Sequence, residues 1–384
     1  MTPDARVQTA AEILDRIAAG EVAERALTTW ARGARFAGSK DRAAVRDHVF
    51  DALRRWRSAS AAGGGASGRH IMLGLLRLDD ADPDTLFTGT RHGPAPLTEE
   101  ERSGGAGPEG HDLWDLPDWL CARLDAAYGA EAEAVATALR VRAPVTLRVN
   151  TLKADVTSAV RALADEGIET APNPLAPCAL TVTANARRVA QCTAYGDGRV
   201  ELQDAASQAV VDLLPLAPGA RVLDLCAGGG GKALAIAARL GGGPVEAWDA
   251  DPGRMRDLPP RANRAGADIR ILRAPQDAYD LVLTDVPCSG SGAWRRTPEE
   301  KWRLSPERLV QLQAIQDGIL DRAADLLAPG GTLAYATCSI LPNENDARID
   351  AFLDRRPGWR SVLRRQFLPG PDGDGFFTAH LMHA

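Results

Sequence analysis

The chain has 384 residues, 45% hydrophobic and 25% charged, which is typical of a globular protein with two or three domains. No run approaches the ~20 consecutive apolar residues of a membrane span, and the net charge of −6 does not by itself indicate a nucleic-acid partner. Six cysteines lie far apart, with no CxxC pair and no histidine cluster, so we expect neither disulfides nor a metal site. Reduced thiols, and a first stretch unlike a secretory signal, predict a cytoplasmic protein.

The first part of the chain has helical periodicity. Apolar side chains recur at three- and four-residue steps over residues 5–58, and again over 70–77. Glycines and serines at 59–68 predict a loop, and residues 90–112 predict an exposed connection. We expect an all-α domain over residues 1–130.

Charge is distributed unevenly in this region. Residues 1–70 carry twelve Lys and Arg against eight Asp and Glu, whereas residues 71–120 carry three against eleven. A basic first segment can contact phosphate, although a solvated helix surface gives the same pattern.

The rest of the chain has the texture of an α/β protein. Residues 131–215 alternate strand and helix patterns, as in "VTLRVNTLK" (145–153), and predict a small α/β subdomain. From 216 to 384, short apolar strands alternate with glycine loops and helices, which predicts a parallel sheet covered on both faces. Ligands of such sheets bind at the carboxyl ends of the strands.

The first of these strands ends in a glycine loop, "VLDLCAGGGGK" (222–232), that leads into a helix. Glycines let the backbone approach a ligand and present N–H groups at a helix N-terminus. A phosphate loop needs Ser or Thr where Ala233 stands, and the spacing of a dinucleotide fingerprint is only loosely met. An adenosyl-methionine loop, with Asp224 just before the glycines, fits best. The next strand ends in Asp249, the usual position for an acid that holds a ribose.

Two cysteines follow later strands, in "TDVPCSGSG" and "YATCSI". C5 of cytosine becomes nucleophilic only after a soft, detachable nucleophile adds at C6, and a thiolate has both properties. A carboxyl group near N3 supports the charge that builds on the ring. Asp285, Cys288 and Cys338 supply these groups at two strand ends of one predicted sheet.

These segments resemble RNA cytosine-C5 methyltransferases of the RsmB/Sun/Nop2 type. The motifs are "LRVNTLK", "GRVELQDAASQAV", "VLDLCAGGGGK", "TDVPCSGSGAWRRTPEEKW" and "YATCSILPNEND". The resemblance implies a Rossmann-like class I SAM-dependent methyltransferase domain, preceded by a NusB-like RNA-binding domain as in the bacterial RsmB branch. It also implies S-adenosyl-L-methionine as cofactor and RNA as partner, with 16S ribosomal RNA as the expected substrate, no membrane partner and a monomer.

The resemblance also implies roles for individual residues. Cys338 becomes the attacking nucleophile, Cys288 assists release of the product, Asp285 contacts the cytosine, and Lys232 lies near cofactor and base. The implied cofactor-binding residues are Cys226, Ala227, Gly228, Gly229, Gly230, Gly231, Lys232, Asp249 and Asp285.

Two departures from the family pattern affect the cofactor site. The family usually reads AAPGGKT where this chain has AGGGGKA, which predicts a more flexible loop that keeps its N–H donors. Arg273 stands about where the family has an acid near the adenine, so adenine recognition falls to backbone groups or Gln276.

RNA contacts beyond the target base are expected after Cys288, where one aromatic is interleaved with cations. The expected contact residues are Trp294, Arg295, Arg296, Lys301, Arg148 and Lys153. A base in folded RNA would have to be extruded to reach Cys338. Two alternatives stay open: a DNA cytosine-C5 methyltransferase that uses Cys288 as nucleophile, and a non-catalytic RNA-binding or assembly factor.

Overall fold

The computed structural model describes residues 1–276 and 278–383, and the chain forms two compact units. The first unit contains Met1–Arg142 and Trp294–Arg303, and the second contains Ala143–Ala293 and the chain from Leu304 onward. Within the described ranges no helix combines the length and apolarity needed to cross a bilayer.

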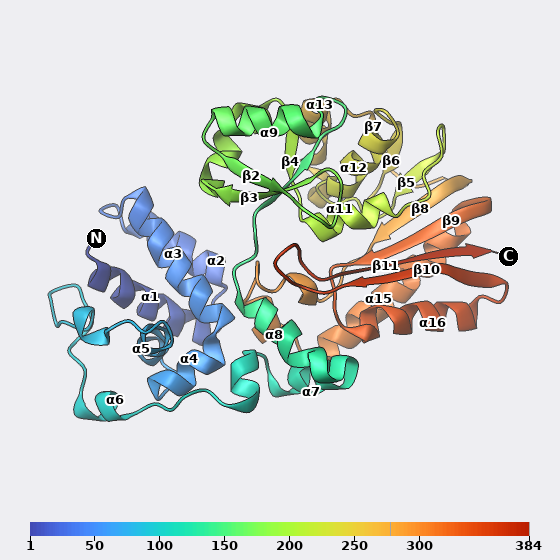
Figure 1. Ribbon diagram of the computed structural model, residues 1–384. Coiled ribbons are helices and arrows are strands. Elements are labelled where there is room, and N and C mark those ends of the chain that lie inside the picture. Colours follow the sequence, from blue (N-terminus) through green and yellow to red (C-terminus); the bar gives the residue numbers. More distant parts are fainter. Residues whose placement is uncertain (277, 384) are drawn as a thin grey trace. The chain divides into compact units, whose positions relative to one another are not determined.

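The first unit is helical (Figure 1). Its helices are α1 (Pro3–Ala18), α2 (Ala23–Gly33), α3 (Ser39–Arg54), α4 (Trp56–Gly63), α5 (Gly68–Leu78), α6 (Glu99–Ser103), α7 (Asp118–Tyr128), α8 (Ala132–Arg140) and α14 (Glu300–Arg303). One apolar core joins α1 to α5. The helices continue ten residues beyond the expected boundary at residue 130, to Arg140. The loop expected at 59–68 is wrong for its first half, because Ala59 and Ala62 are buried and extend α4 until Gly64 ends it in a left-handed conformation.

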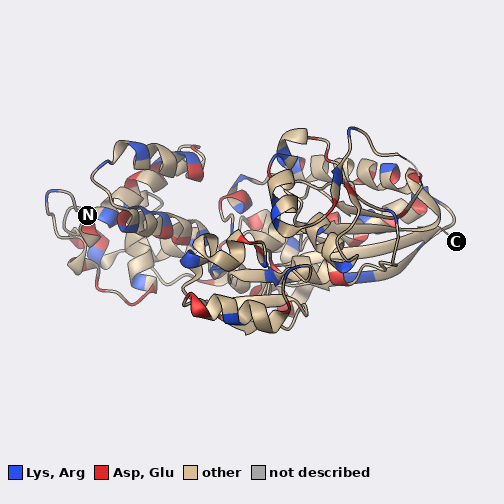
Figure 2. Ribbon diagram, turned by 90° about the horizontal axis from the view of Figure 1, so that it is seen from above, with Lys and Arg blue, Asp and Glu red and all other residues tan. Residues whose placement is uncertain are grey.

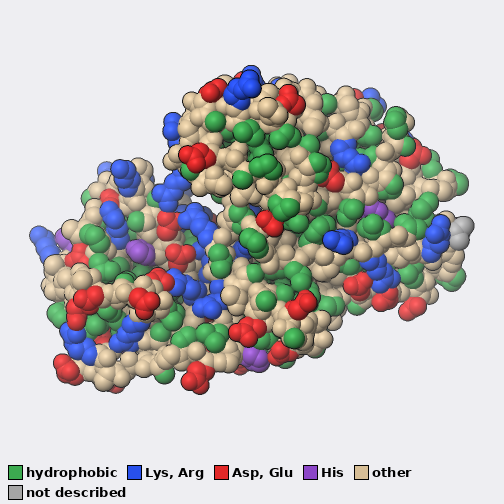
Figure 3. Space-filling view, in the orientation of Figure 1, with side chains coloured by type: hydrophobic (Ala, Val, Ile, Leu, Met, Phe, Trp, Pro, Cys, Tyr) green, Lys and Arg blue, Asp and Glu red, His purple; other side chains and the backbone are tan. Residues whose placement is uncertain are grey.

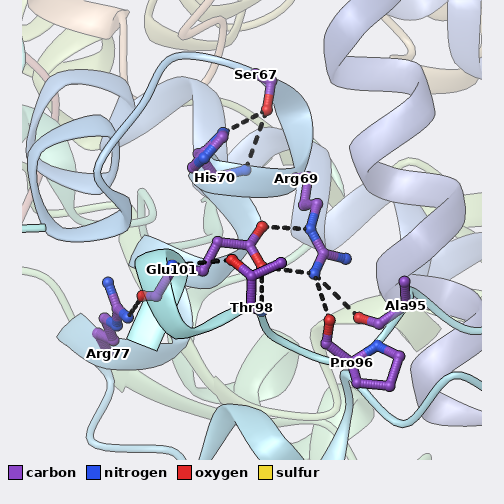
Figure 4. Close-up of polar contacts among 8 residues, drawn as sticks. All are labelled: Ser67, Arg69, His70, Arg77, Ala95, Pro96, Thr98 and Glu101. Carbon is purple, nitrogen blue, oxygen red and sulfur yellow. Dashed lines mark hydrogen bonds and ion pairs between the residues drawn. The ribbon is translucent and has the colours of Figure 1, made fainter. Parts of the chain in front are cut away.

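Arginines of α5 attach the long connection between α5 and α7 (Figure 4). Arg69 donates to both carboxylate oxygens of Glu101 on α6, at 2.6 and 2.9 Å, and to the carbonyls of Ala95 and Pro96. This bidentate pair, with burial opposing, lowers the pKa of Glu101 to about 2. The region expected to be an exposed connection is therefore held by charged hydrogen bonds, with Leu97 also packed against the apolar core.

The segment Trp294–Arg303, which we call the inserted segment, contributes to the helical unit. Trp294 and Lys301 are fully buried, and Trp302 packs against the core of α1 to α5. The Lys301 ammonium donates to Arg54 O at 2.9 Å, and the Trp302 indole donates to Leu53 O at 2.8 Å. These carbonyls lie at the last turn of α3, where they have no partner within the helix.

The second unit begins with a small antiparallel sheet ordered β2-β3-β1-β4. Its elements are β1 (Thr146–Val149), α9 (Val156–Asp165), β2 (Glu169–Pro172), β3 (Ala179–Ala184), α10 (Thr193–Gly196) and β4 (Val200–Leu202). The small sheet and the large sheet belong to the same compact unit. The three-domain division at residues 130 and 215 stays a prediction.

The large sheet has the order β10-β11-β9-β8-β5-β6-β7, and β11 is antiparallel to β9. Its elements are α11 (Ala205–Asp212), β5 (Val222–Asp224), α12 (Gly231–Arg239), β6 (Val245–Ala247), α13 (Leu258–Ala265), β7 (Ile269–Ile271), β8 (Tyr279–Asp285), α15 (Pro306–Asp325), β9 (Leu327–Thr337), α16 (Asp346–Arg355), β10 (Trp359–Phe367) and β11 (Phe376–His383). Parallel strands extend both ways from the β5–β8 pair, which confirms the predicted doubly wound α/β fold.

Alternating side chains bury both faces of this sheet. On β8, Val282 packs in the core under α15 and α16, while Leu281 and Leu283 pack in the core under α11 and α12. The long strands β9 and β11 contain no Asp, Glu, Lys or Arg (Figure 2). The carboxylates Asp224 and Asp285 stand at the last positions of β5 and β8, and they belong to the site described below.

We predict that Trp302→Ala destabilises the protein by about 2–4 kcal/mol, because it removes a large packed ring and leaves Leu53 O without its donor. Chemical denaturation of the whole chain measures this change. The neighbouring Arg303→Ala removes only a surface pair with Glu299 and should cost less than about 0.5 kcal/mol. Equal effects of the two variants would contradict the structural role of Trp302.

Candidate active site

Strand register collects the predicted site residues at one edge of the large sheet. Asp224 on β5 lies opposite Ala247 on β6, and Asp285 on β8 lies opposite Ala336 on β9. Asp249 follows β6 and Cys338 follows β9 directly. Because these strands are parallel, all their carboxyl ends meet at this edge.

The two cysteines expected at the site lie side by side. The Sγ atoms of Cys288 and Cys338 are 3.4 Å apart, and both residues are half-buried. The hydrogen bond to Cys338, together with burial, raises the pKa of Cys288 well above its ordinary value. A raised pKa keeps the proton on Cys288, and the geometry allows either sulfur to donate to the other.

Lys232 and Asp285 form an ion pair next to the thiols. The Lys232 Nζ donates to Asp285 Oδ2 at 2.7 Å and lies 5.0 Å from the centre of the Phe376 ring. Burial opposes the charge of Lys232, but the Asp285 carboxylate outweighs it and raises the pKa of Lys232. Asp285 is 34% exposed, and its Oδ1 has no hydrogen-bond partner among the described residues, so it is free to meet a ligand.

The backbone of the glycine loop comes close to neighbouring side chains. Gly228 and Gly230 adopt φ of +47° and +80°, and a Cβ on Gly230 would lie 2.0 Å from Leu258 Cδ1. Arg261 on α13 donates to the carbonyl of Gly229 and pairs at 3.1 Å with the buried Glu201. The loop is thus tied to α13 although it lacks the family's proline.

Asp249 is buried and its carboxylate is already engaged. Oδ2 accepts from Gly228 N at 3.0 Å and pairs with Arg254 at 3.3 Å, while Oδ1 accepts from Asp251 N. The Arg254 side chain is 53% exposed.

Arg273, which stands where the family has an acid, is exposed and is held through its backbone. Its carbonyl accepts from the Trp248 indole at 3.3 Å. Gln276 is exposed and is the last residue of the first described range.

Asp224 is a buried carboxylate that lacks well-formed hydrogen bonds from the described residues. It is 1% exposed, and neither oxygen accepts a well-formed hydrogen bond from a described residue. Burial, reinforced by the Asp285 carboxylate, raises the pKa of Asp224 to about 7. Burial likewise raises the pKa of the adjacent Cys226 far above that of an exposed thiol, so Cys226 is no nucleophile.

Most of the expected RNA-contact residues are placed elsewhere. Trp294, Arg295 and Lys301 are at most 2% exposed inside the helical unit, where Arg295 O accepts from Arg54 Nε at 2.8 Å. Their burial corrects the expectation of RNA contact: these side chains serve the helical core, and Arg296 is the exposed member of the group.

The other two expected contacts differ from each other. Arg148 is 5% exposed and donates to Gln203 Oε1 at 2.7 Å, and burial lowers its pKa to about 10. Lys153 is exposed, although its Nζ donates to Asp197 O at 2.9 Å. Of these two residues, Lys153 is the exposed one.

Sequence reasoning missed Glu344, which lies behind the two thiols. This fully buried carboxylate accepts from Ser289 N at 2.8 Å and from Gln316 Nε2 at 3.0 Å, and it accepts from the hydroxyls of Ser289 and Ser339. Ser289 follows Cys288 and Ser339 follows Cys338, so one carboxylate holds both cysteine loops. The signal was the motif "YATCSILPNEND", in which this acid follows Cys338 closely.

We predict that Glu344→Gln costs at least about 2 kcal/mol of stability, because an amide cannot accept from all four buried donors. Both cysteines should also react faster with iodoacetamide, measured by peptide mass spectrometry. The exposed-carboxylate variant Asp354→Asn is the matched control and should change neither quantity. Unchanged stability and thiol reactivity in Glu344→Gln would refute the clamping role.

A pH prediction follows from Asp224. Because its pKa is raised on folding, the stabilisation is fully present below the unfolded pKa of about 4 and is lost as pH rises through about 7. The wild type should therefore lose stability relative to Asp224→Asn as the pH rises from 5 to 8. Urea denaturation at both pH values measures this change in the difference between their free energies of unfolding. The difference between the wild type and the Asp354→Asn control should not change with pH. If Asp224→Asn were more stable than the wild type at pH 5 but not at pH 8, the predicted direction would be wrong.

Comparison with known proteins identifies the family. The sequence model described as 16S rRNA methyltransferase RsmB/F matches residues 211–382. A ferredoxin-like domain of RsmF/B-like methyltransferases matches residues 116–189. The ribosomal RNA small subunit methyltransferase B of Xylella fastidiosa (strain 9a5c) is 37% identical over 287 residues, covering 69% of this chain and 68% of that protein.

Solved structures show the same fold. A methyltransferase homologue from Pyrococcus horikoshii has a TM-score of 0.63 at 24% identity, covering 71% of this chain and 96% of its own. NSun6 from Pyrococcus horikoshii, solved with SFG, has a TM-score of 0.62 at 18% identity, covering 70% and 98%. The family resemblance expected from the motifs is confirmed, as is the methyltransferase class: the chain belongs to the RsmB/F family of 16S rRNA methyltransferases.

Proposed function

We propose that this protein methylates C5 of a cytosine in RNA, with 16S ribosomal RNA as substrate and S-adenosyl-L-methionine as methyl donor. The observation that carries the proposal is the pair of thiols 3.4 Å apart, beside Asp285 and the glycine loop. Its relatives are named for ribosomal RNA methylation, which supports the substrate class. The six free thiols fit the expected cytoplasmic location.

The loop before α12 suits the cofactor. Gly228 and Gly230 keep the backbone bare of side chains on the ligand side, and the buried oxygens of Asp224 lack the donors that a bound ligand can provide. NSun6, a structural neighbour, was solved with SFG, an analogue of adenosyl-methionine. When bound, this cofactor supplies an electrophilic methyl group. Cys226–Lys232 would hold it, with Asp249 for the ribose.

The chain's own residues account for the remaining chemistry. The Cys338 thiolate adds to C6 of the cytosine and forms an S–C6 bond. The C5–C6 π electrons move onto C5, which becomes nucleophilic. Asp285, held by Lys232, meets the cytosine edge through its free Oδ1 as charge builds there. After C5 is methylated, a solvent base takes the C5 proton, the C5–C6 double bond re-forms, and the C6–S bond breaks so that Cys338 leaves as a thiolate. Cys288, which retains its proton, assists this release.

Covalent capture on RNA containing 5-fluorocytosine tests the assignment, because fluorine blocks loss of the C5 proton and traps the adduct. Wild type and Cys288→Ser should form the adduct in the presence of cofactor, and Cys338→Ala should lose it by at least ~100-fold. Capture by Cys338→Ala but not by Cys288→Ser would instead assign a DNA-type mechanism with Cys288 as nucleophile.

Two further measurements separate the remaining alternatives. Titration with adenosyl-methionine tests the non-catalytic alternative, since a binding factor without methyltransfer would show no saturable binding. Bisulfite sequencing of ribosomal RNA from cells with and without the gene identifies the cytosine. An unchanged pattern in 16S ribosomal RNA would refute the substrate.

A further inference from the structure

The stretch from Arg25 to Lys40, which covers most of α2 and the turn into α3, is purely cationic. It contains Arg25, Arg32, Arg35 and Lys40 and no Asp or Glu. All four side chains are exposed. In a chain with net charge −6, such a run marks a local positive surface.

Helix geometry aligns part of this run. Arg25, Thr28, Thr29 and Arg32 follow the spacing i, i+3, i+4 and i+7, so they lie along one exposed face of α2. Leu27 and its neighbours bury the opposite face in the core of the unit. This face of α2 thus offers guanidinium groups at both ends and hydroxyl donors between them.

The turn after α2 points an aromatic ring outward. Ala34 and Ala37 are each 4% exposed and anchor the turn, while Arg35 and Phe36 between them face solvent. Phe36 is 75% exposed, although burial of such a ring would be favourable. An exposed ring next to a guanidinium is a stacking platform for a nucleobase.

Most, but not all, of the other arginines within residues 1–102 pair with a carboxylate. Eight arginines within residues 1–102 form ion pairs with carboxylates: Arg6, Arg16, Arg46, Arg54, Arg55, Arg57, Arg69 and Arg102. None of the four cations between Arg25 and Lys40 has a carboxylate partner in the described part of the chain. Free cations beside an exposed ring complement the phosphates and bases of RNA.

We propose that this α2 face and turn are an RNA-docking surface, on which the four cations bind phosphates of an unpaired strand and Phe36 stacks on one of its bases. This rests on the proposed function for the identity of the partner, but it concerns binding rather than methyl transfer. It fits a single-stranded or loop segment, because bases in a duplex are not free to stack on a side chain.

Binding of unmodified, transcribed 16S ribosomal RNA to the whole protein tests the surface, in the Cys338→Ala background and without cofactor. Replacing the four cations together by Gln should weaken binding and reduce the slope of log K against log[salt] by about 3. Phe36→Ala should weaken binding by about 10-fold with the slope unchanged. Arg91→Gln with Arg102→Gln, two exposed cations of the same unit, should leave affinity and slope unchanged.

The outcomes separate the surface from the reaction. If the four-Gln variant melts like the wild type and binds the RNA with unchanged affinity and slope, the surface is refuted. If the four-Gln variant lost binding to phosphatidylglycerol vesicles but kept its affinity for RNA, the surface would be assigned to a membrane. That result would also refute the proposed RNA docking. If the proposed C5 methylation fails but the four-Gln variant loses RNA binding, the docking surface stands by itself.

Discussion

The parallel pairing of β8 with β9 is the constraint on which the candidate active site depends. Because Asp285 lies opposite Ala336, the segments that leave the two strands enter the same space and bring Cys288 within 3.4 Å of Cys338. Glu344 completes the arrangement by accepting from the serine that follows each thiol. A buried carboxylate is costly without such donors, so the network forms only when both loops are in place.

Ionisable side chains are concentrated around this edge of the sheet. Asp285 accepts from Lys232, and Asp224 lies buried without a well-formed hydrogen bond from the described residues. Cys288 is held as a thiol beside Cys338. Burying any one of these groups without the others would cost free energy. Together they form a set in which a positive charge, a carboxylate and a protonated thiol surround one sulfur atom.

The fold and the thiol pair could be predicted because each depends on short local patterns. Strands that end in Asp224, Asp285 and Cys338 are apolar runs, and parallel topology alone brings their ends together. The expected RNA contacts could not be judged this way. Lys301 looks like any basic residue in the sequence, yet its ammonium is buried against a helix-end carbonyl. Glu344 was likewise missed, since composition does not show which acid is buried and fully hydrogen-bonded.

The inserted segment has a consequence for how the chain can be divided. It starts just after Gly292, whose close approach to Gly375 leaves no room for a Cβ, and it ends in the core of the helical unit with Trp302. A fragment that stops at Arg142 would lose two tryptophans and a buried lysine, and a fragment that starts at Ala143 would carry them without their partners. The helical unit therefore cannot be exchanged for another domain by replacing residues 1–142 alone. Residues 294–303 would have to be replaced as well.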